Sequence, residues 1–546
     1  MMKFKLICIA FALQNFIFSQ ITEKPKLVVG IVVDQMCYEY LYRYQAKFGE
    51  NGFKKIMQNG TNCQNTQYNY VPTYTGPGHA SIYTGSTPSN HGIVANDWFV
   101  RAENKETNCV DDASVNPIGS KSEDGLKSPK NLIVNTITDQ LKLTYAQSKV
   151  ISMSIKDRGA ILPGGHISDG SYWFDYSTGG FITSSFFKKE LPTWVAQFNG
   201  EKRVESYLKQ TWNTLYAVDK YSESGPDNSP YELLFPTKKT PEFPYDLKAI
   251  TGGKADYNTF VATPFANTYL ADFALKSIEN EQLGKDDASD FLAISFSTPD
   301  IVGHSFGPYS VELEDIYLRL DLEIEKIISY LEQNLGKDNF VFFLTADHAV
   351  VPVPQYLVDK KLPGGYVYIK PLEEELNKAI QAKYGEDLIS EITNDNIYLD
   401  RAKIAAKNIN KVELENLITS LIQGMKGIKR VYNSHELMNP NAADEWLSMV
   451  QKGYRYEESG DIIFILESGY LPKSADTENS HKGTSHGSAY NYDTQVPLLW
   501  YGKNIPTQNI YRKINITDIT ATLAPILQIQ RPNSCVGQPI LEILGK

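Results

Sequence analysis

Acidic and histidine side chains that could bind a metal ion occur in pairs at two places in the sequence. Asp300 and His304 lie four residues apart in STPDIVGHSFG, and Asp347 and His348 are adjacent in TADHAV. At either spacing, a carboxylate oxygen and an imidazole nitrogen can reach one cation. Each pair alone is more often a surface pair or a hydrogen-bonded loop, so the metal interpretation depends on their joint occurrence.

Further donors occur elsewhere in the chain. Asp34 ends the apolar run KLVVGIVVDQ, and the glycine- and serine-rich segment HKGTSHGSAYNYD contains His481 and His486, either of which could complete a ligand set. Donor sets of Asp and His without cysteine favour zinc, with manganese and iron as alternatives. The sequence therefore predicts two cation sites.

A threonine stands at a sharp turn in VPTYTGPGHAS. The hydroxyl of Thr75 beside a divalent cation can lose its proton near working pH and act as a nucleophile. The flanking glycines and Pro77 fit a helix start, where free N–H groups favour an anion. Two cations about 4 Å apart suit phosphate. Lys156 and Arg158, two apart on a predicted strand, would share a face and bind phosphoryl oxygens.

The elements expected to position these residues are hydrophobic strands that each end in ionisable side chains. Four such segments cover residues 26–35, 149–158, 290–300 and 339–348. Nearly continuous apolar runs are typical of buried parallel strands, whose carboxyl ends form the sites of α/β proteins. Residues 310–336 have a Ser310 cap and helical apolar spacing, which predicts a crossover helix between two adjacent parallel strands.

These patterns predict an α/β fold, with a central mostly parallel sheet flanked by helices. We expect one catalytic domain over residues 20–546, with insertions at about 100–290 and 360–460 that form a cap. The segments 495–504 and 516–529 indicate a late return of the chain to the core.

The composition and the chain start bear on partners and location. With 53 basic and 64 acidic residues the net charge is −11, which argues against nucleic-acid and anionic-membrane partners. Residues 1–19 carry two lysines and then an apolar stretch too short to span a membrane, which predicts a signal peptide cleaved near Ser19/Gln20. The mature chain is then periplasmic or secreted, and we expect a monomer.

The cysteines permit a disulfide framework. The four cysteines of the mature chain allow two disulfides in three pairings, which the sequence does not distinguish; they are Cys37, Cys63, Cys109 and Cys535.

Taken together, the motifs resemble a known family. VVDQ, PTYTGPGH, GIVANDWF, IKDR, STPDIVGHSFGP, ADH and KGTSHG occur in the order found in the alkaline phosphatase superfamily. The chain is most similar to secreted, broad-specificity bacterial alkaline phosphatases that use threonine. The resemblance implies hydrolysis of small phosphorylated metabolites that are phosphate monoesters, with two Zn²⁺ ions and a phosphothreonine intermediate.

The resemblance also implies a role for each site residue. One zinc would be bound by Asp300, His304 and His486, and the other by Asp34, Thr75, Asp347 and His348. The phosphoryl oxygens would be bound by Asn96, Lys156 and Arg158. One departure is Ala349, where relatives usually have glycine, and this could crowd the second metal site.

Alternative functions remain open from the sequence. Nucleotide pyrophosphatases/phosphodiesterases share the metal motifs and the threonine, but the Lys156 and Arg158 pair favours a dianionic monoester. A sulfatase is disfavoured because Thr75 is followed by Gly-Pro-Gly. A non-catalytic exported binding protein would be expected to lack a ligand or the nucleophile, and none is missing.

Overall fold

A ten-stranded mixed sheet runs through the larger part of the protein. The computed structural model describes residues 23–439 and 444–545, so the predicted signal peptide over 1–19 lies outside the described residues. In spatial order the strands are β22 (Gln508–Ile510), β2 (Thr61–Cys63), β21 (Leu498–Gly502), β13 (Phe340–Thr345), β1 (Leu27–Val33), β12 (Asp290–Phe296), β7 (Val150–Ser154), β8 (Gly170–Phe174), β9 (Phe181–Ser184) and β6 (Pro117–Ile118).

The four predicted apolar strands form the parallel centre of this sheet, which confirms the α/β fold class. β1 pairs in parallel with both β12 and β13, with Val33 opposite Phe296 and Val32 opposite Thr345. Because the strands end in register, the residues that follow them emerge at the same edge. Antiparallel pairs occur toward both sides, including β13 with β21 and β8 with β9.

One detail of the predicted topology is wrong. The long helix α14 (Val311–Asn334) does connect β12 to β13, but these strands are not neighbours, because β1 lies between them. Every residue of β1 is buried, as expected for the middle of the sheet. The apolar pattern identifies a crossover helix, but it does not say which strand occupies the space between the two strands that the helix joins.

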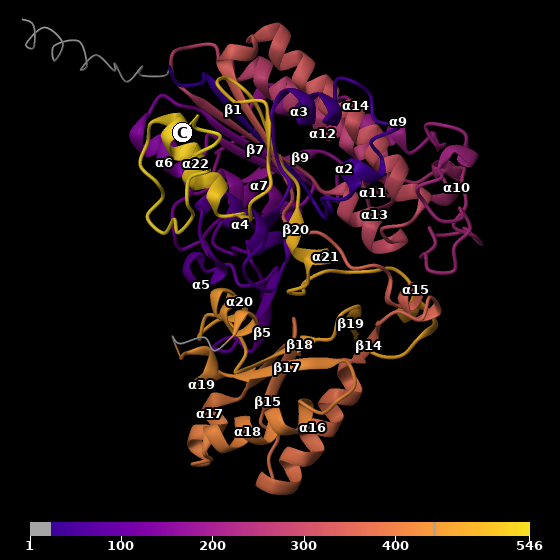
Figure 1. The fold of residues 1–546 in the computed structure, drawn as a ribbon, viewed down its shortest axis with the longest axis vertical. Coiled ribbons are helices and arrows are strands. Elements are labelled where there is room, and N and C mark those ends of the chain that lie inside the picture. The colour runs from indigo at the N-terminus through magenta and orange to yellow at the C-terminus, as the bar shows by residue number, and fades with distance from the viewer. Residues whose placement is uncertain (1–22, 440–443, 546) are drawn as a thin grey trace, which may run out of the picture.

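Two groups of helices cover the sheet. In Figure 1, β1 and β7 run between a group containing α4 (Thr75–Thr84), α7 (Asp157–Gly164) and α22 (Asp518–Leu527) and a group containing α12 (Pro264–Asn280) and α14. The predicted cap of α14 is present, since Ser310 Oγ accepts from the Leu313 amide at 3.1 Å. The range 100–290, expected as insertions, also supplies β7, β8, β9 and α12 to this core.

A smaller domain, defined here as residues 365–473, lies apart from the large sheet at the bottom of Figure 1. It has a separate hydrophobic core and an antiparallel sheet in the order β15–β16–β18–β17. These strands are β15 (Ile389–Thr393), β16 (Asn396–Leu399), β18 (Ile462–Leu466) and β17 (Ile428–Asn433), packed with α16 (Ile369–Tyr384) and α18 (Lys411–Ile422).

The smaller domain is attached to the segment that follows Asn96. Asn394 Nδ2 donates to the Asp97 carbonyl at 2.6 Å, and Arg101 donates to the buried Asp461 carboxylate at 3.0 Å. The ring of Phe99 also packs edge-on against Tyr398, with 5.5 Å between centroids. These contacts hold β4 (Asp97–Val100) against the smaller domain.

The permitted disulfides are not formed. All four cysteines of the described chain carry free thiols, and three of them are buried. Cys37 and Cys63 lie in the main core, whereas Cys109 lies in a separate small cluster, so their positions follow apolar packing. Burial raises the pKa of the Cys37 thiol to about 12. Within residues 23–439 and 444–545, no helix has the length and apolar character to cross a membrane.

Candidate active site

The first predicted metal group is assembled from α13 (Thr298–Phe306) and the loop after residue 483. His304 Nε2 lies 3.1 Å from Asp300 Oδ1, and His486 Nε2 lies 3.6 Å from the same oxygen. Asp300 and His304 lie one helical turn apart on α13, so their side chains project from the same face. One donor atom from each of the three residues lies within 4.8 Å of the others.

The second predicted metal group joins the ends of β1 and β13. Asp34, Asp347 and His348 also offer donor atoms within 4.8 Å of one another. His348 Nε2 lies 3.4 Å from Asp34 Oδ1 and 3.7 Å from Asp347 Oδ2. The two groups adjoin, because the rings of His348 and His486 are stacked with centroids 3.4 Å apart.

Backbone carbonyls fix the orientation of all three imidazoles. Nδ1 of His304 is 2.8 Å from the Thr484 carbonyl, and Nδ1 of His486 is 2.7 Å from the Thr73 carbonyl. Nδ1 of His348 is 3.0 Å from the Ala349 carbonyl. With Nδ1–H donated to a carbonyl, the lone pair of Nε2 points toward the shared centre, which is the arrangement that metal-binding histidines require.

The electrostatics of this site fit positively charged ions. Asp34 Oδ1 and Asp347 Oδ2 are buried without a hydrogen-bond partner, and the buried Asp34 Oδ2 pairs with the Lys156 ammonium at 2.7 Å. Burial and then Asp34 raise the pKa of Asp347 well above its usual range. For Asp34, burial and Asp300 raise the pKa, but Lys156 and His348 outweigh them and lower it. Such a pair cannot hold two negative charges without a cation between them, so the donor set fits a metal site.

Thr75 is the first residue of α4 and lies beside the second group. Its side chain is buried, and its Oγ1 is 3.4 Å from His348 Nε2 and 3.5 Å from Lys156 Nζ. Gly78, three residues after Thr75, is required for close packing, since a Cβ at this position would lie 2.3 Å from the Asp347 carbonyl oxygen. The local sequence therefore places a hydroxyl at a helix N-terminus beside the second donor group.

The predicted phosphate-binding side chains of Lys156 and Asn96 contact Thr75 and Gly76, although one local prediction is wrong. Lys156 Nζ contacts Asp34 Oδ2 at 2.7 Å and Asp300 Oδ2 at 2.5 Å. Asn96 Oδ1 accepts from the Gly76 amide at 2.7 Å, and the buried Nε of Arg158 has no acceptor. Lys156 and Arg158 do not share a strand, because β7 ends at Ser154 and Lys156 is the N-cap of α7.

Two further residues support the site but do not stand out in the sequence: Gln35 connects the two groups, and His79 contacts the backbone of Thr75. Gln35 donates from Nε2 to Asp300 Oδ1 at 2.6 Å and from its backbone amide to Asp347 Oδ1 at 3.1 Å. His79 lies between the Thr75 carbonyl, at 2.9 Å from Nδ1, and Ser295 Oγ, at 2.8 Å from Nε2. The position of Gln35 directly after Asp34 is the signal that could have drawn attention to it.

Ala349 and His481 can also be placed. The Ala349 amide donates to the Asp493 carbonyl at 2.8 Å. The φ of Ala349 is not positive, so this backbone conformation does not require glycine. His481, the alternative ligand to His486, instead contacts Gln355 and Asp476 at the surface.

The fold and the paired donor groups define a member of the alkaline phosphatase superfamily. Residues 28–489 match the family described as type I phosphodiesterase / nucleotide pyrophosphatase, and the chain belongs to this family.

The similar proteins cover nearly the whole chain. A protein of Myroides odoratus named calcium-transporting ATPase is 42% identical over 96% of both chains. Alkaline phosphatase PhoV of Synechococcus elongatus is 38% identical over the full length of both. Alkaline phosphatase PafA of Elizabethkingia meningoseptica is 39% identical over 96% of this chain and 95% of its own.

The crystal structure of PafA matches this fold with a TM-score of 0.91 over 96% of this chain and 99% of that one, at 38% identity. A second PafA structure carries substitutions of one threonine, one asparagine, one lysine and one arginine.

Proposed function

We propose that this protein is an alkaline phosphatase that hydrolyses phosphate monoesters through a phosphothreonine at Thr75. The observation that carries the proposal is the buried Thr75 hydroxyl, which lies 3.4 Å from His348 of the second donor set and 3.5 Å from Lys156, whose ammonium also pairs with Asp300 of the first set. The relatives named alkaline phosphatases support it. So do the four residue types substituted in PafA, which recur in the same chain order as Thr75, Asn96, Lys156 and Arg158.

Two Zn²⁺ ions are the proposed cofactors. Asp300, His304 and His486 would hold one ion, and Asp34, Asp347 and His348 with Thr75 would hold the other. When bound, zinc lowers the pKa of a neighbouring hydroxyl and stabilises negative charge on a departing oxygen. The donors are nitrogen and oxygen atoms without thiolate, which suits this ion.

The residues of this chain would carry out a double displacement. Thr75 Oγ1 attacks phosphorus while the bond to the alcohol oxygen breaks, so phosphothreonine forms and the alcohol leaves. Water then cleaves the phosphothreonine, which releases phosphate and restores the hydroxyl. Lys156, Arg158 and the Asn96 amide bind the non-bridging oxygens and compensate their charge as it shifts in the transition state.

The cationic side chains favour a monoester over a diester. A monoester dianion presents three non-bridging oxygens; Lys156 Nζ lies 3.5 Å from Thr75 Oγ1, and the buried Nε of Arg158 has no hydrogen-bond partner. A diester has one charge fewer and needs room for a second substituent. Nucleotide pyrophosphatase/phosphodiesterase activity is the second candidate function, because the matched family bears that description.

A substrate panel with purified protein tests the proposal. Phenyl phosphate, a phenyl diester, a phenyl sulfate ester and ATP are compared with and without a chelator. ATP is included because one relative is named an ATPase. We expect fastest turnover of phenyl phosphate, loss with chelator, recovery with zinc, and no turnover by Thr75→Ala. Faster diester cleavage would support the alternative, and no cleavage of any ester would support a non-catalytic binding protein.

We extend the proposal to organisation and location. Residues 20–546 would form one catalytic unit with insertions at about 100–290 and 360–460, exported to the periplasm or the medium after cleavage near Ser19/Gln20. The protein would act as a monomer on small phosphorylated metabolites. The N-terminal sequence of the exported protein and its mass in solution test these statements.

A further inference from the structure

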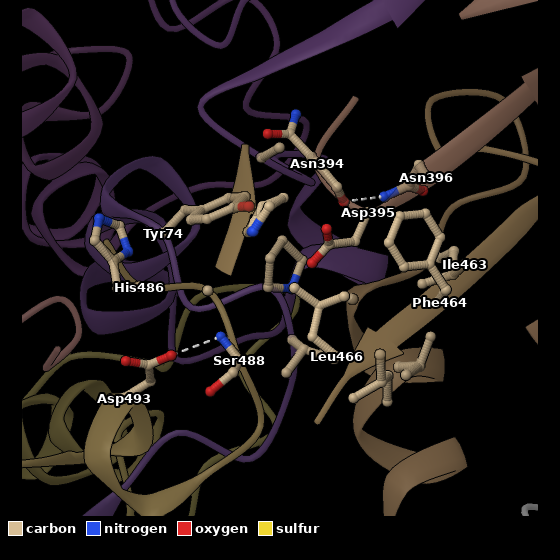
Figure 2. A pocket seen from close by; sticks show the side chains of 18 of the residues that line it. Tyr74, Asn394, Asp395, Asn396, Ile463, Phe464, Leu466, His486, Ser488 and Asp493 are labelled. Carbon is tan, nitrogen blue, oxygen red and sulfur yellow. Dashed lines mark hydrogen bonds between the residues drawn. The ribbon is translucent and has the colours of Figure 1, made fainter. Parts of the chain in front are cut away.

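A cavity lies between the large sheet domain and the smaller domain and reaches the candidate active site. We call it the interdomain cavity; it is partly open to solvent. Figure 2 shows that His486 and Tyr74 line one part of it and that Asp395 and Phe464 of the smaller domain line another. The chain thus leaves a space that begins at a predicted metal ligand.

The position of Tyr74 connects this cavity to the reaction. Tyr74 directly precedes Thr75, and its ring packs edge-on against His486 with 5.5 Å between centroids. In Figure 2 the Tyr74 ring lies between His486 and Asp395. The alcohol part of an ester bound at Thr75 therefore has a path along this ring.

The charge in the cavity is negative and lacks a counterion. Among the described residues that line it, Asp395 and Asp493 are acidic and none is a lysine or an arginine. Asp395 Oδ1 and Asp493 Oδ1 are buried without a hydrogen-bond partner, and the side chain of Asp493 is almost fully buried. Burial raises the pKa of each to about 7. A cationic ligand would remove this cost of burial.

The backbone explains how Asp395 reaches this position. Asn394 and Asp395 form the two-residue loop of the β15–β16 hairpin, with φ of 51° and 59°. Two successive left-handed residues define a hairpin turn that asparagine and aspartate tolerate well. The hairpin tip is anchored by Asn394 to the Asp97 carbonyl, one residue beyond Asn96. The turn geometry requires a residue of this kind, but it does not require a carboxylate oxygen that is buried without a hydrogen-bond partner.

We infer that the interdomain cavity is a leaving-group subsite for phosphate monoesters whose alcohol carries an ammonium group. This inference rests on the proposed function. The phosphoryl group would lie at Thr75, and the carbon chain would pass Tyr74 along apolar side chains such as Val71 and Ile463. The ammonium group would donate a hydrogen bond to Asp395 Oδ1 beside the ring of Phe464, a pairing of cation, carboxylate and aromatic face.

The test uses phosphonates, because they cannot lose their alkyl group and so report binding alone. Each pair has equal length and differs by an ammonium in place of a methyl group: 2-aminoethyl against propyl, 3-aminopropyl against butyl, and 4-aminobutyl against pentyl phosphonate. Inhibition constants are measured with phenyl phosphate as substrate. We expect at least one amine to bind about tenfold more tightly than its alkyl match, as for a hydrogen bond to a charged group.

Variants assign that preference to Asp395. Asp395→Asn keeps the turn and nearly the shape, and Asp395→Gly, which also accepts positive φ, is the second variant in case the first folds poorly. Both should bring the ratio of inhibition constants to within about twofold of one, as expected when the charged partner of the hydrogen bond is lost. The matched control Asp387→Asn removes an exposed carboxylate of the same domain and should retain the preference.

Each outcome decides the inference. No preference for any amine in the unmodified protein overturns it, and so does a preference that persists in both Asp395 variants. If affinity rises equally with chain length for alkyl and aminoalkyl phosphonates, the cavity is an apolar subsite instead. Failure of the proposed function is distinguishable, because the unmodified enzyme would then not hydrolyse phenyl phosphate at all.

Discussion

Replacing Gln35 by methionine should weaken metal binding at one of the two donor groups only. The Gln35 side chain donates to Asp300 Oδ1 at 2.6 Å, in the first group, whereas its contact with Asp347 in the second group comes from the backbone amide. Methionine has a similar length and cannot donate this hydrogen bond. Since Gln35 already has a φ of 69°, both side chains bear the same backbone cost.

The size of the effect follows from the charge of the acceptor. A hydrogen bond to a charged group contributes about 1.5–3 kcal/mol. At about 1.4 kcal/mol for each factor of ten, the zinc dissociation constant of the first group should rise about 10- to 150-fold. Residues that orient metal ligands typically show about the same range when mutated. The zinc dissociation constant of the second group should change by no more than about twofold, because its backbone donor is retained.

The assay is a titration of the metal-free protein with zinc in chelator buffers, followed by thermal unfolding and by bound metal. Gln58→Met, at an exposed position of α3 (Phe53–Asn59), is the matched control and should titrate like the unmodified protein. If both binding steps shift equally, or neither shifts, then Gln35 does not orient Asp300 as we infer.

Lys156→Ala should lower kcat/KM for phenyl phosphate about 10- to 100-fold, because it removes a charged donor. The kcat/KM for a phenyl diester should fall by a smaller factor. Measured rates for both esters test this, and an equal loss for the two would contradict it. Asp461→Asn should lower the free energy of unfolding by about 3–5 kcal/mol, because this buried carboxylate accepts hydrogen bonds from Arg101 at 3.0 Å and Arg401 at 2.8 Å. Urea unfolding measures the change, and an unchanged midpoint would refute a stabilising role for Asp461. Burial raises the pKa of Glu312 from 4.5 to about 8, so its contribution to stability is complete below pH 4.5 and is lost as the pH rises through 8. Glu312→Gln should therefore raise the Tm at pH 8 and change it little at pH 5, and a similar change at both pH values would show that ionisation is not the cause.

Some features of this protein could be predicted from local patterns in its sequence. Asp34 and Asp347 could be selected from the sequence because each follows a continuous apolar run, and parallel strands buried on both faces end at one edge of a sheet. The helix over 311–334 could be located from its cap and its apolar spacing, which are local features. The resemblance to a known family added the assignment of ligands to two groups.

Only the tertiary structure decided the contacts between distant segments. Gln35 and His79 look ordinary in the sequence, and their roles appear only when Asp300 and Ser295 are placed beside them. The free thiols and the central place of β1 likewise depend on packing across the sheet.

Asp395 is the clearest case of a residue whose meaning comes from the fold. In the sequence it is a turn residue in TNDN, and a turn of this kind is usually solvated. The smaller domain places it instead in a cavity beside Tyr74 and His486, without a partner for its charge. Sequence patterns report local propensity and periodicity, whereas burial of a charge depends on which surfaces meet, and that is set by the whole chain.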